Sequence, residues 1–380
     1  MRLEVHPVAE WPRLAPVWAD LYRQSGSRSF FLTEEWTETW LETFAGRLKV
    51  SILVFESEQG PAGICLLTEC TRRPLLRLRR LSLNAAGEAV SESTYIEHNN
   101  VLCRPGWETA VARRLAAHVL SLRWDEFALD GMQDGPVYQT LKRTLPGISF
   151  EEESRPCHYA DLLAPRRSGT TFEACLRGLH RKNLRRSIRQ YATLGPLRLE
   201  RAAESGRALE MFEELGDLSR RRMVTQGRTS TFEAPRFLAF HHRLIARCFG
   251  NGSIDMLRLT AGSQVVGVLY DLIQAGKVHE YQGAFRYPEG RPLSPGIVAH
   301  ALAIQYCLDR GLDEWDFLAG GEVSKRALAT GSRNLYWTVF RRPCLRTGLL
   351  AAARKVRRWL RRRPAGTGSR YASGSPEKAE

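Results

Sequence analysis

The sequence predicts an α/β protein made of two similar halves, each a mixed, mainly antiparallel sheet flanked by helices. The chain has 380 residues, which suffices for about two domains of ordinary size. Its composition, 43% hydrophobic and 26% charged, is that of a globular protein. A helix followed by a strand recurs about half a chain apart, with WDEFALDG at 124–131 and EWDFLAGG at 314–321 as the two strands. This repeat indicates an internal duplication.

The first half opens its regular structure with a helix. Thr33 is an N-cap candidate, and the acidic Glu34 and Glu35 suit the first helical turn. The turn Gln59-Gly60-Pro61 separates two apolar runs that read as strands. The expected elements are, in order, a helix at 33–44, strands at about 49–56 and 62–70, a helix at 107–121 and a strand at 124–131.

The second half repeats this plan after a set of long helices. The dipeptides Ala261-Gly262 and Ala275-Gly276 join three strands into an antiparallel meander. The expected elements are helices at 171–194, 206–226 and 235–249, strands at 253–260, 264–274 and 277–285, a helix at 296–311 and a strand at 314–321. Pro146-Gly147 breaks regular structure between the halves. We therefore expect domains at 1–150 and 151–342, followed by a tail at 343–380.

The positive charge is concentrated in two segments. The net charge is 56 − 41 = +15. Residues 341–363 hold ten basic residues and no acid, and Leu345, Leu349, Val356, Trp359 and Leu360 recur near helical spacing. This pattern describes a basic amphipathic helix, which can lie on an anionic membrane surface or bind polyanions, although a solvated tail without a partner has the same composition. The small, polar residues after Pro364 predict disorder.

The second basic segment is LRGLHRKNLRRSIRQY at 176–191. At helical spacing its cations fall on one side, with Phe172, Leu176 and Leu179 facing roughly the other way. Cations gathered on one side repel one another unless an anion lies opposite, and phosphate is the expected anion. A solvated helix face is the alternative. The cations are Arg177, Arg181, Lys182, Arg185, Arg186 and Arg189.

Cysteine usage and the N-terminal residues bear on compartment and metals. The eight cysteines form no C-x-x-C pair and most lie in apolar surroundings, which suits a reducing cytoplasm better than a disulfide framework. His241-His242 is the only adjacent pair of histidines, so no metal is expected. The N-terminus lacks the apolar core of a secretory signal, and no apolar run is long enough to span a bilayer. We therefore expect a cytoplasmic protein, with the basic tail in peripheral contact with the inner membrane.

Several segments together resemble a known family. The second half resembles a GNAT acetyltransferase domain of the cellulose-biosynthesis CelD-like group. The whole chain is similar to the Fem-type peptidoglycan aminoacyltransferases, which carry two such domains in tandem. The resembling pieces are FFLTEEWTETWLETF at 30–44, FEACLRGLHRKNLRRSIRQYATLG at 172–195, VVGVLYDLI at 265–273, HEYQGAF at 279–285, the stretch at 293–325 and YWTVFRR at 336–342.

The resemblance implies two tandem GNAT-like domains and acyl-coenzyme A as co-substrate. In that family a glycine-rich loop before a helix holds the pyrophosphate, but FRYPEGRPLSPG at 285–296 lacks that fingerprint. Ser294, Pro295 and Gly296 nevertheless suit a helix start, where free N–H groups can face an anion or simply cap a helix. We expect Ser294 and Gly296, with Lys182 and Arg186 of the basic helix, to bind the coenzyme.

Acyl transfer also needs groups that handle protons near the thioester. Glu280 is a candidate base and Tyr281 a candidate donor to the leaving thiolate; as neighbours in a strand, only one can face a cleft. The other candidate catalytic residues are Asp316, which alternates with aromatic residues, Lys325, which matches a lysine of the resembling family, and His180 on the basic helix. A histidine side chain can shuttle protons, although a surface histidine has the same sequence context.

Three functions stay open on the sequence. The first is an acyltransferase acting on an amine or hydroxyl of a small-molecule or lipid-linked acceptor of the cell envelope or of polysaccharide synthesis. The second is a transfer-RNA-dependent aminoacyltransferase of the Fem type, the one case in which we expect nucleic acid as a partner. The third is a non-catalytic basic adaptor for membranes or nucleic acid. The chain contains neither G-x-S-x-G nor G-x-x-x-x-G-K-[ST], which argues against a serine hydrolase and a nucleoside triphosphatase of those classes.

Overall fold

The computed structural model describes residues 1–72, 77–145, 148–287, 293–320 and 323–348. Four sequence predictions fall wholly or partly on other residues. The break at Pro146-Gly147, residues 349–363 of the basic amphipathic helix and the polar segment after Pro364 lie outside the described residues, as does the middle of the 285–296 loop. No helix in the described part of the chain is both long and apolar enough to cross a membrane.

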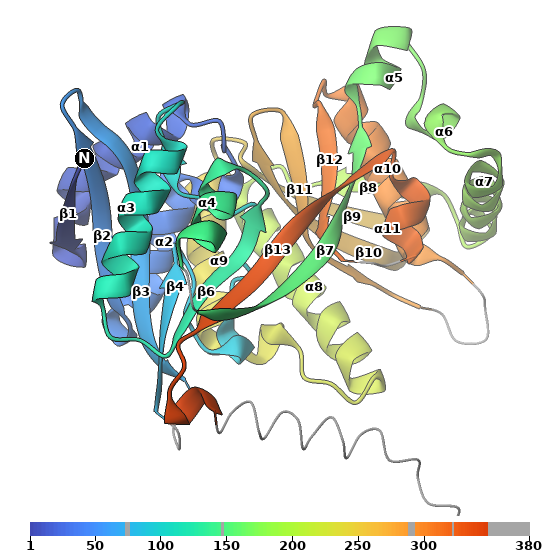
Figure 1. The fold of residues 1–380 in the computed structure, drawn as a ribbon. Helices are drawn as coiled ribbons and strands as arrows, with labels where there is room; N and C mark the ends of the chain where they lie inside the picture. The colour runs from blue at the N-terminus through green and yellow to red at the C-terminus, as the bar shows by residue number, and fades with distance from the viewer. Residues whose placement is uncertain (73–76, 146–147, 288–292, 321–322, 349–380) are drawn as a thin grey trace, which may run out of the picture.

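The first half contains a sheet covered by helices on both faces (Figure 1). Its strands are β1 (Arg2–Pro7), β2 (Lys49–Ser57), β3 (Gly60–Arg72), β4 (Leu78–Leu83), β5 (Leu102–Cys103) and β6 (Glu126–Gln133). Its helices are α1 (Trp11–Gln24), α2 (Glu34–Phe44), α3 (Glu108–Ser121) and α4 (Pro136–Thr144). As the sequence predicts, Thr33 caps α2, and its side-chain oxygen accepts a hydrogen bond from the Trp36 N–H at 3.2 Å.

The second half follows the same order of elements. Its strands are β7 (Ser149–Asp161), β8 (Leu197–Arg201), β9 (Ile254–Ala261), β10 (Gln264–Gln274), β11 (Lys277–Phe285), β12 (Glu314–Ala319) and β13 (Gly331–Arg341). Its helices are α5 (Leu163–Ser168), α6 (Phe172–Cys175), α7 (Gly178–Ala192), α8 (Ser205–Thr225), α9 (Pro235–Cys248), α10 (Pro295–Asp309) and α11 (Val323–Leu328).

The strand pairing confirms that the two halves share one plan. In each half a run of antiparallel strands, β1 to β4 or β8 to β11, is followed by a helical crossover to a parallel strand, β6 or β12. The full order is β1-β2-β3-β4-β6-β13-β7-β12-β11-β10-β9-β8, with β5 beside β3. The predicted α/β fold with mixed, mainly antiparallel sheets is therefore confirmed.

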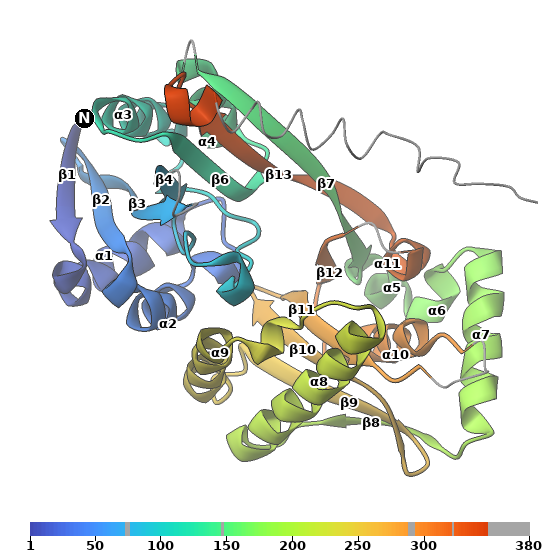
Figure 2. The same cartoon turned by 90° about the horizontal axis from the view of Figure 1, so that it is seen from below.

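Two long strands tie the halves together. β13, the last strand of the second half, lies between β6 of the first half and β7 and pairs with both (Figures 1 and 2). On its other side, β7 pairs with β12. The pairing of β13 with β7 runs without interruption from Gly331↔Tyr159 to Arg341↔Ser149. The domain boundary expected between residues 150 and 151 falls within β7. β13 belongs to the second half in sequence, but it pairs with β6 and so extends the sheet of the first half.

A shared aromatic core fixes the halves against each other. Helices α1 and α2 of the first half and α8 and α9 of the second contribute to one buried cluster. Trp36 on α2 packs edge-on against Phe240 on α9, with ring centroids 4.9 Å apart. At its rim, the Arg247 guanidinium donates to Glu42 at 2.8 Å. Because both halves bury aromatic surface here, the halves form one packed body.

The basic segment forms a helix that begins later than the sequence predicts. α6 ends at Cys175 and α7 begins at Gly178, so Leu176 lies in the break and is buried while Leu179 is 68% exposed. The expectation that Leu179 shares the apolar side is therefore wrong. The Arg181 side chain donates to the carbonyls of Glu173, Ala174 and Leu176, which stabilises the break by capping α6.

Candidate functional site

A gap opens in the second sheet where two parallel strands diverge. β11 and β12 pair only over Lys277–His279 and Glu314–Asp316, although β11 continues to Phe285. A β-bulge follows, because Asp271 pairs with Glu280 and Tyr270 with Gln282, which leaves Tyr281 as an extra residue. Bulges bend a strand and redirect its side chains, and they are common beside active sites. The bulge therefore sets which β11 side chains face the gap.

Three polar side chains meet on the α10 side of this gap. The Glu280 carboxylate lies 3.2 Å from His300 Nε2 on α10 and 3.6 Å from Lys325 Nζ on α11. Glu280 and His300 are almost fully buried. Burial alone would raise the pKa of Glu280, but Lys325 and His300 outweigh it and lower that pKa, so the carboxylate is held ionised. Lys325 Nζ also donates to the Phe317 carbonyl of β12 at 2.7 Å and so bridges the inner part of the gap.

A cavity of about 600 Å³, here called the donor cavity, lies beside the diverging end of β11. Glu280 itself does not line the cavity, but its carboxylate lies directly behind Gly283, which does: a Cβ on Gly283 would lie 2.7 Å from Glu280 Oε1. The cavity is lined by Ser219, Arg222, Met223, Gln226, Arg228, Gly283, Ala284, Phe285, Tyr287, Leu293, Ser294, Pro295, Gly296 and Ile297.

The donor cavity is built to accept negative charge. It lies at the N-terminus of α10, where Pro295 occupies the first turn and Ser294 is the N-cap residue without a side-chain capping bond. The guanidinium of Arg222 lies over the Tyr287 ring at 4.2 Å, and Arg228 lines the same cavity. The 15-residue α10 thus directs free N–H groups toward a space that also holds two arginines.

The corresponding gap in the first half is filled by the chain itself. β4 and β6 pair only over Arg80–Ser82 and Glu126–Ala128, as β11 and β12 do. Beyond that point Asn99 pairs with the edge of β6: its N–H donates to the Gly131 carbonyl at 2.9 Å, and its carbonyl accepts from Gln133. The Asn84 side chain donates to Asn99 Oδ1 at 2.7 Å. The 96–99 segment therefore takes up most of the space between these described strands, and a smaller cavity of about 160 Å³ is lined by Arg80, Asp130 and Ile96.

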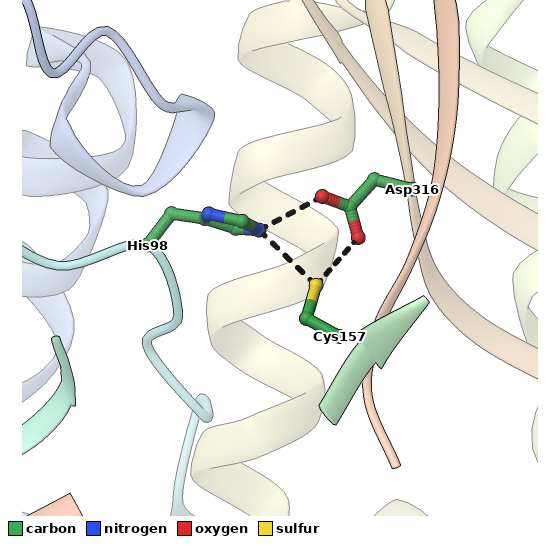
Figure 3. Close-up of side chains that lie close together, drawn as sticks. All are labelled: His98, Cys157 and Asp316. Atoms are coloured by element: carbon green, nitrogen blue, oxygen red, sulfur yellow. Dashed lines mark hydrogen bonds and ion pairs between the residues drawn. The ribbon is translucent and has the colours of Figure 1, made fainter. Parts of the chain in front are cut away.

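The segment that fills this gap carries a histidine into a second polar cluster, the junction cluster of His98, Cys157 and Asp316 (Figure 3). His98 Nε2 lies 2.9 Å from Asp316 Oδ2, and Cys157 Sγ lies 3.0 Å from Asp316 Oδ1. All three side chains are at most 3% exposed. They come from the first half, from β7 and from β12, so the cluster sits where the halves meet.

The junction cluster lacks the order of a nucleophilic triad. In a cysteine–histidine–aspartate triad the histidine lies between its partners and uses a different nitrogen for each. Here Nε2 of His98 faces both Asp316 and Cys157, the latter at 3.7 Å, while Nδ1 faces Gln133 Nε2 at 3.2 Å. Burial and the neighbouring Asp316 carboxylate raise the pKa of the Cys157 thiol. The thiol is therefore not activated by its surroundings.

The structure separates the catalytic residues expected from the sequence. Glu280 and Lys325 lie together, whereas Asp316 belongs to the junction cluster. The Tyr281 hydroxyl donates to the Thr94 carbonyl at 2.6 Å and its ring packs in the shared core, so it holds the first half instead of facing the donor cavity. His180 is half-buried on α7 and does not line this cavity.

The structure also separates the four residues expected to bind the coenzyme. Ser294 and Gly296 line the donor cavity. Lys182 lines a different cavity, a groove of about 590 Å³ on α7 that also contains Arg185 and Arg189. Arg186 is exposed and lines neither.

Sequence reasoning missed His300, His98, Cys157 and the two arginines of the donor cavity. One signal was present: His300 interrupts the apolar helix GIVAHALAIQYCL, where a buried histidine needs a partner.

Asp271, the register partner of Glu280, is expected to lower the stability of the fold as pH rises, and one substitution tests this. Both its carboxylate oxygens are buried without a hydrogen-bond partner, and burial, then Glu280, raises the pKa of Asp271 well above its ordinary value. Because the pKa of Asp271 is higher in the folded than in the unfolded protein, the free energy of unfolding falls as pH rises from about 4 toward the folded-state pKa. The loss is about 1.4 kcal/mol per pH unit. Asp271→Asn is expected to remove this loss.

The measurement is urea unfolding of both proteins between pH 5 and pH 8. The stability advantage of Asp271→Asn should widen as pH rises, whereas Asp20→Asn at an exposed site should leave a constant difference. Parallel curves for the wild type and Asp271→Asn would contradict the assignment.

The comparisons with known proteins agree with this geometry. Residues 179–326, less than half of the chain, match the family model for an acetyltransferase (GNAT) domain. No curated protein matches the sequence. The matched stretch contains α7 to β12 and the start of α11, and so holds both the donor cavity and the Glu280 cluster. The GNAT match indicates an acyltransferase.

Solved structures of similar fold span almost the whole chain. FemX is 10% identical with a TM-score of 0.54, over 89% of this chain and 97% of FemX. The C-terminal domain (DUF2156) described as that of a putative lysylphosphatidylglycerol synthetase from Agrobacterium fabrum is 11% identical, with a TM-score of 0.52 over 91% of this chain and 96% of that domain. L-PGS from Bacillus licheniformis is 12% identical, with a TM-score of 0.50 over 90% and 96%. These similarities concern the fold alone, and with the GNAT match they confirm two tandem GNAT-like units.

Proposed function

We propose that this protein transfers an acyl group from acyl-coenzyme A, bound in the donor cavity, to an amine or hydroxyl acceptor. The observation that carries the proposal is the position of the cavity, between the diverging end of β11 and the start of α10, with the ionised Glu280 behind Gly283 of its lining. A phosphate-bearing donor fits the outer part, where Arg222, Arg228 and the α10 N-terminus gather positive potential.

Glu280 is the proposed proton acceptor. As the acceptor's nitrogen or oxygen attacks the thioester carbon, Glu280 takes up its proton, directly or through one water. The new bond to the carbonyl carbon forms, the carbon–sulfur bond breaks, and the thiolate leaves. Lys325 and His300 hold the carboxylate in place and keep it ionised between turnovers.

The first half has a different role in this proposal. The gap between β4 and β6 is filled by residues 96–99. The first half therefore serves to support the second half, through the Tyr281–Thr94 hydrogen bond and the shared core. The acceptor class we propose, a component of the cell envelope or of polysaccharide synthesis, follows the resemblance to the CelD-like and Fem-type groups. Membership of the CelD-like group and contact of the basic tail with the inner membrane stay predictions.

The test is a screen for coenzyme A release. Purified full-length protein is incubated with acetyl- or longer acyl-coenzyme A and a panel of amino sugars, polyamines, amino acids and sugar alcohols, and the freed thiol is titrated. Isothermal titration calorimetry with the same donors measures binding alone. Acceptor-dependent thiol release supports the proposal. No heat of binding with any acyl-coenzyme A would end it.

The arginines of the donor cavity provide a sharper prediction. Arg222→Ala and Arg228→Ala should each weaken acetyl-coenzyme A binding about 10-fold, because a charge-assisted bond to phosphate at an exposed site contributes about 1.4 kcal/mol. Arg221→Ala is the matched control, since Arg221 is an exposed neighbour on α8 that does not line the cavity. Equal losses in all three variants would indicate a general charge effect instead of this site.

A Fem-type, transfer-RNA-dependent activity is the second candidate, favoured by the cationic groove on α7. Lys182, Arg185 and Arg189 line that groove, which is large enough to follow a phosphate backbone. Lys182→Ala combined with Arg189→Ala should then reduce RNA binding in a salt-dependent gel-shift assay while leaving acyl-coenzyme A binding unchanged. RNA binding without acyl-coenzyme A binding would favour this candidate over the first.

A further inference from the structure

The junction cluster has the arrangement of a metal site, although Cys157, His98 and Asp316 lie far apart in the sequence. The three ligand atoms converge on one point, all within 4.8 Å of one another (Figure 3). A tetrahedral zinc site, with bonds of about 2.0–2.3 Å, separates its ligand atoms by roughly 3.2–3.8 Å. The His98 Nε2–Asp316 Oδ2 pair at 2.9 Å would need to open by only a few tenths of an ångström, and the Cys157 Sγ–His98 Nε2 pair at 3.7 Å already lies in this range, while Cys157 Sγ is 3.0 Å from the other carboxylate oxygen, Oδ1.

A further imidazole, that of His279, lies beside these three, outside the group whose ligand atoms are within 4.8 Å of one another, so its ring would have to turn to reach a shared ion. His279 pairs in register with Asp316 on the neighbouring strand and stacks on the His98 ring, with centroids 5.3 Å apart. It is 3% exposed, yet neither of its ring nitrogens has a hydrogen-bond partner. A buried imidazole without a partner costs free energy, which a ligand at the cluster would offset.

The surroundings supply the second shell that metal-bound histidines need. The Gln133 side-chain amide lies 3.2 Å from His98 Nδ1, on the side of the ring opposite to Asp316. With a metal on Nε2, Nδ1 carries a proton and donates it to the Gln133 oxygen after a rotation of the amide. Asp316 Oδ1 accepts the Leu318 N–H at 2.7 Å, which fixes the carboxylate. Oδ2 faces His98 Nε2 at 2.9 Å and the Arg333 guanidinium at 3.6 Å, so this oxygen already lies in positive surroundings.

We propose that His98, Cys157 and Asp316, joined by His279 once its ring turns toward them, bind one zinc ion, or a transition-metal ion of similar preference, as a clasp between the two halves. Thiolate, imidazole and carboxylate are the ligands that zinc takes, and four protein ligands make a closed, structural site. Binding deprotonates Cys157 and releases that proton to solvent, so the thiolate and the Asp316 carboxylate balance the two positive charges. The ion would join β7, β11, β12 and the segment that fills the first gap.

The proposal is tested on tag-free, full-length protein after chelation and dialysis. Zinc is added back, bound metal is measured by inductively coupled plasma mass spectrometry, and the unfolding temperature is recorded with and without zinc. We expect one zinc per chain and a rise of several degrees on adding zinc. Replacing zinc with cobalt should give the near-ultraviolet band of a thiolate–cobalt bond. Less than about 0.1 ion per chain after loading would overturn the proposal.

Two variants keep the test decisive even if the cluster is sensitive to change. Cys157→Ala should lose metal and the cobalt–thiolate band, whereas Cys307→Ala, at an equally buried thiol on α10, should keep both. His279→Phe preserves the stack with Phe31 and His98 but removes the nitrogens. With a metal site it abolishes the zinc-dependent rise. If no metal binds, His279→Phe only removes two unpartnered polar atoms and should make the protein more stable. A more stable variant, together with a wild type that does not respond to zinc, would therefore refute the proposed zinc site.

Discussion

Glu280→Gln is expected to lower kcat by about 10²- to 10⁴-fold, the range typical of a lost general base. Glutamine preserves the size of the side chain and can still contact His300 and Lys325, but it cannot take up the acceptor's proton. In the proposed function the donor binds through the outer part of the cavity, where Arg222 and Arg228 lie, so the dissociation constant for acetyl-coenzyme A should change by less than about threefold. A fall in kcat with donor affinity preserved is thus the signature of this role.

The assay uses acetyl-coenzyme A with an acceptor identified by thiol release, and calorimetry measures donor affinity separately. Glu200→Gln is the matched control: Glu200 lies on β8 of the same half and pairs with Arg207 and Arg258, away from the donor cavity, so kcat should be unchanged. If Glu280→Gln keeps full kcat, the proton leaves by another route, while the donor cavity itself stays testable through Arg222. If both parameters collapse together, Glu280 supports the fold instead of the chemistry.

The repeated plan of the chain was predictable because it depends on local patterns. Alternation, capping residues and turn dipeptides placed α2, β2, β3, β9, β10 and β11 close to their observed ends. The pairing of β13 with β6 and β7, which joins the two halves, was not predictable in this way. β7 has the sequence SFEEESRPCHYAD, and its first eight residues are exposed, so it lacks the apolar alternation of a buried strand. Its pairing with β13 joins residues about 170–190 apart, which no local pattern encodes.

The candidate site was predictable to a similar extent. Glu280 and Lys325 were expected, since both belong to resembling segments, HEYQGAF at 279–285 and the stretch at 293–325, and they lie together. Asp316 was expected beside them, but it faces the junction cluster, whose other members come from segments 159 and 218 residues away. Such a cluster depends on how the halves pack, so cysteine spacing along the chain carries no signal for it.

The filled gap of the first half explains why only one half offers a donor cavity among the described residues, and it requires a glycine at one position. Gly131 on β6 has φ +65°, and a Cβ there would lie 2.4 Å from the Ile96 carbonyl oxygen and 2.8 Å from the Glu97 Cα. Both contacts are with backbone, which cannot rotate away. A methyl group at residue 131 would therefore push the 96–97 segment off β6, and with it His98 at the junction.

Gly131→Ala is accordingly expected to destabilise the protein by about 3 kcal/mol or more, the sum of a left-handed backbone penalty and a backbone clash. Gly169→Ala separates the two contributions, because Gly169 has nearly the same φ, +64°, and a Cβ added there would meet nothing within 4 Å. That variant should cost only about 1 kcal/mol in urea unfolding. Equal losses at both positions would mean that the segment yields to the added methyl group, and the first gap would then be a place that ligands can open. A much larger loss at Gly131 would mean that the segment is a fixed part of the sheet, which confines donor binding to the second half.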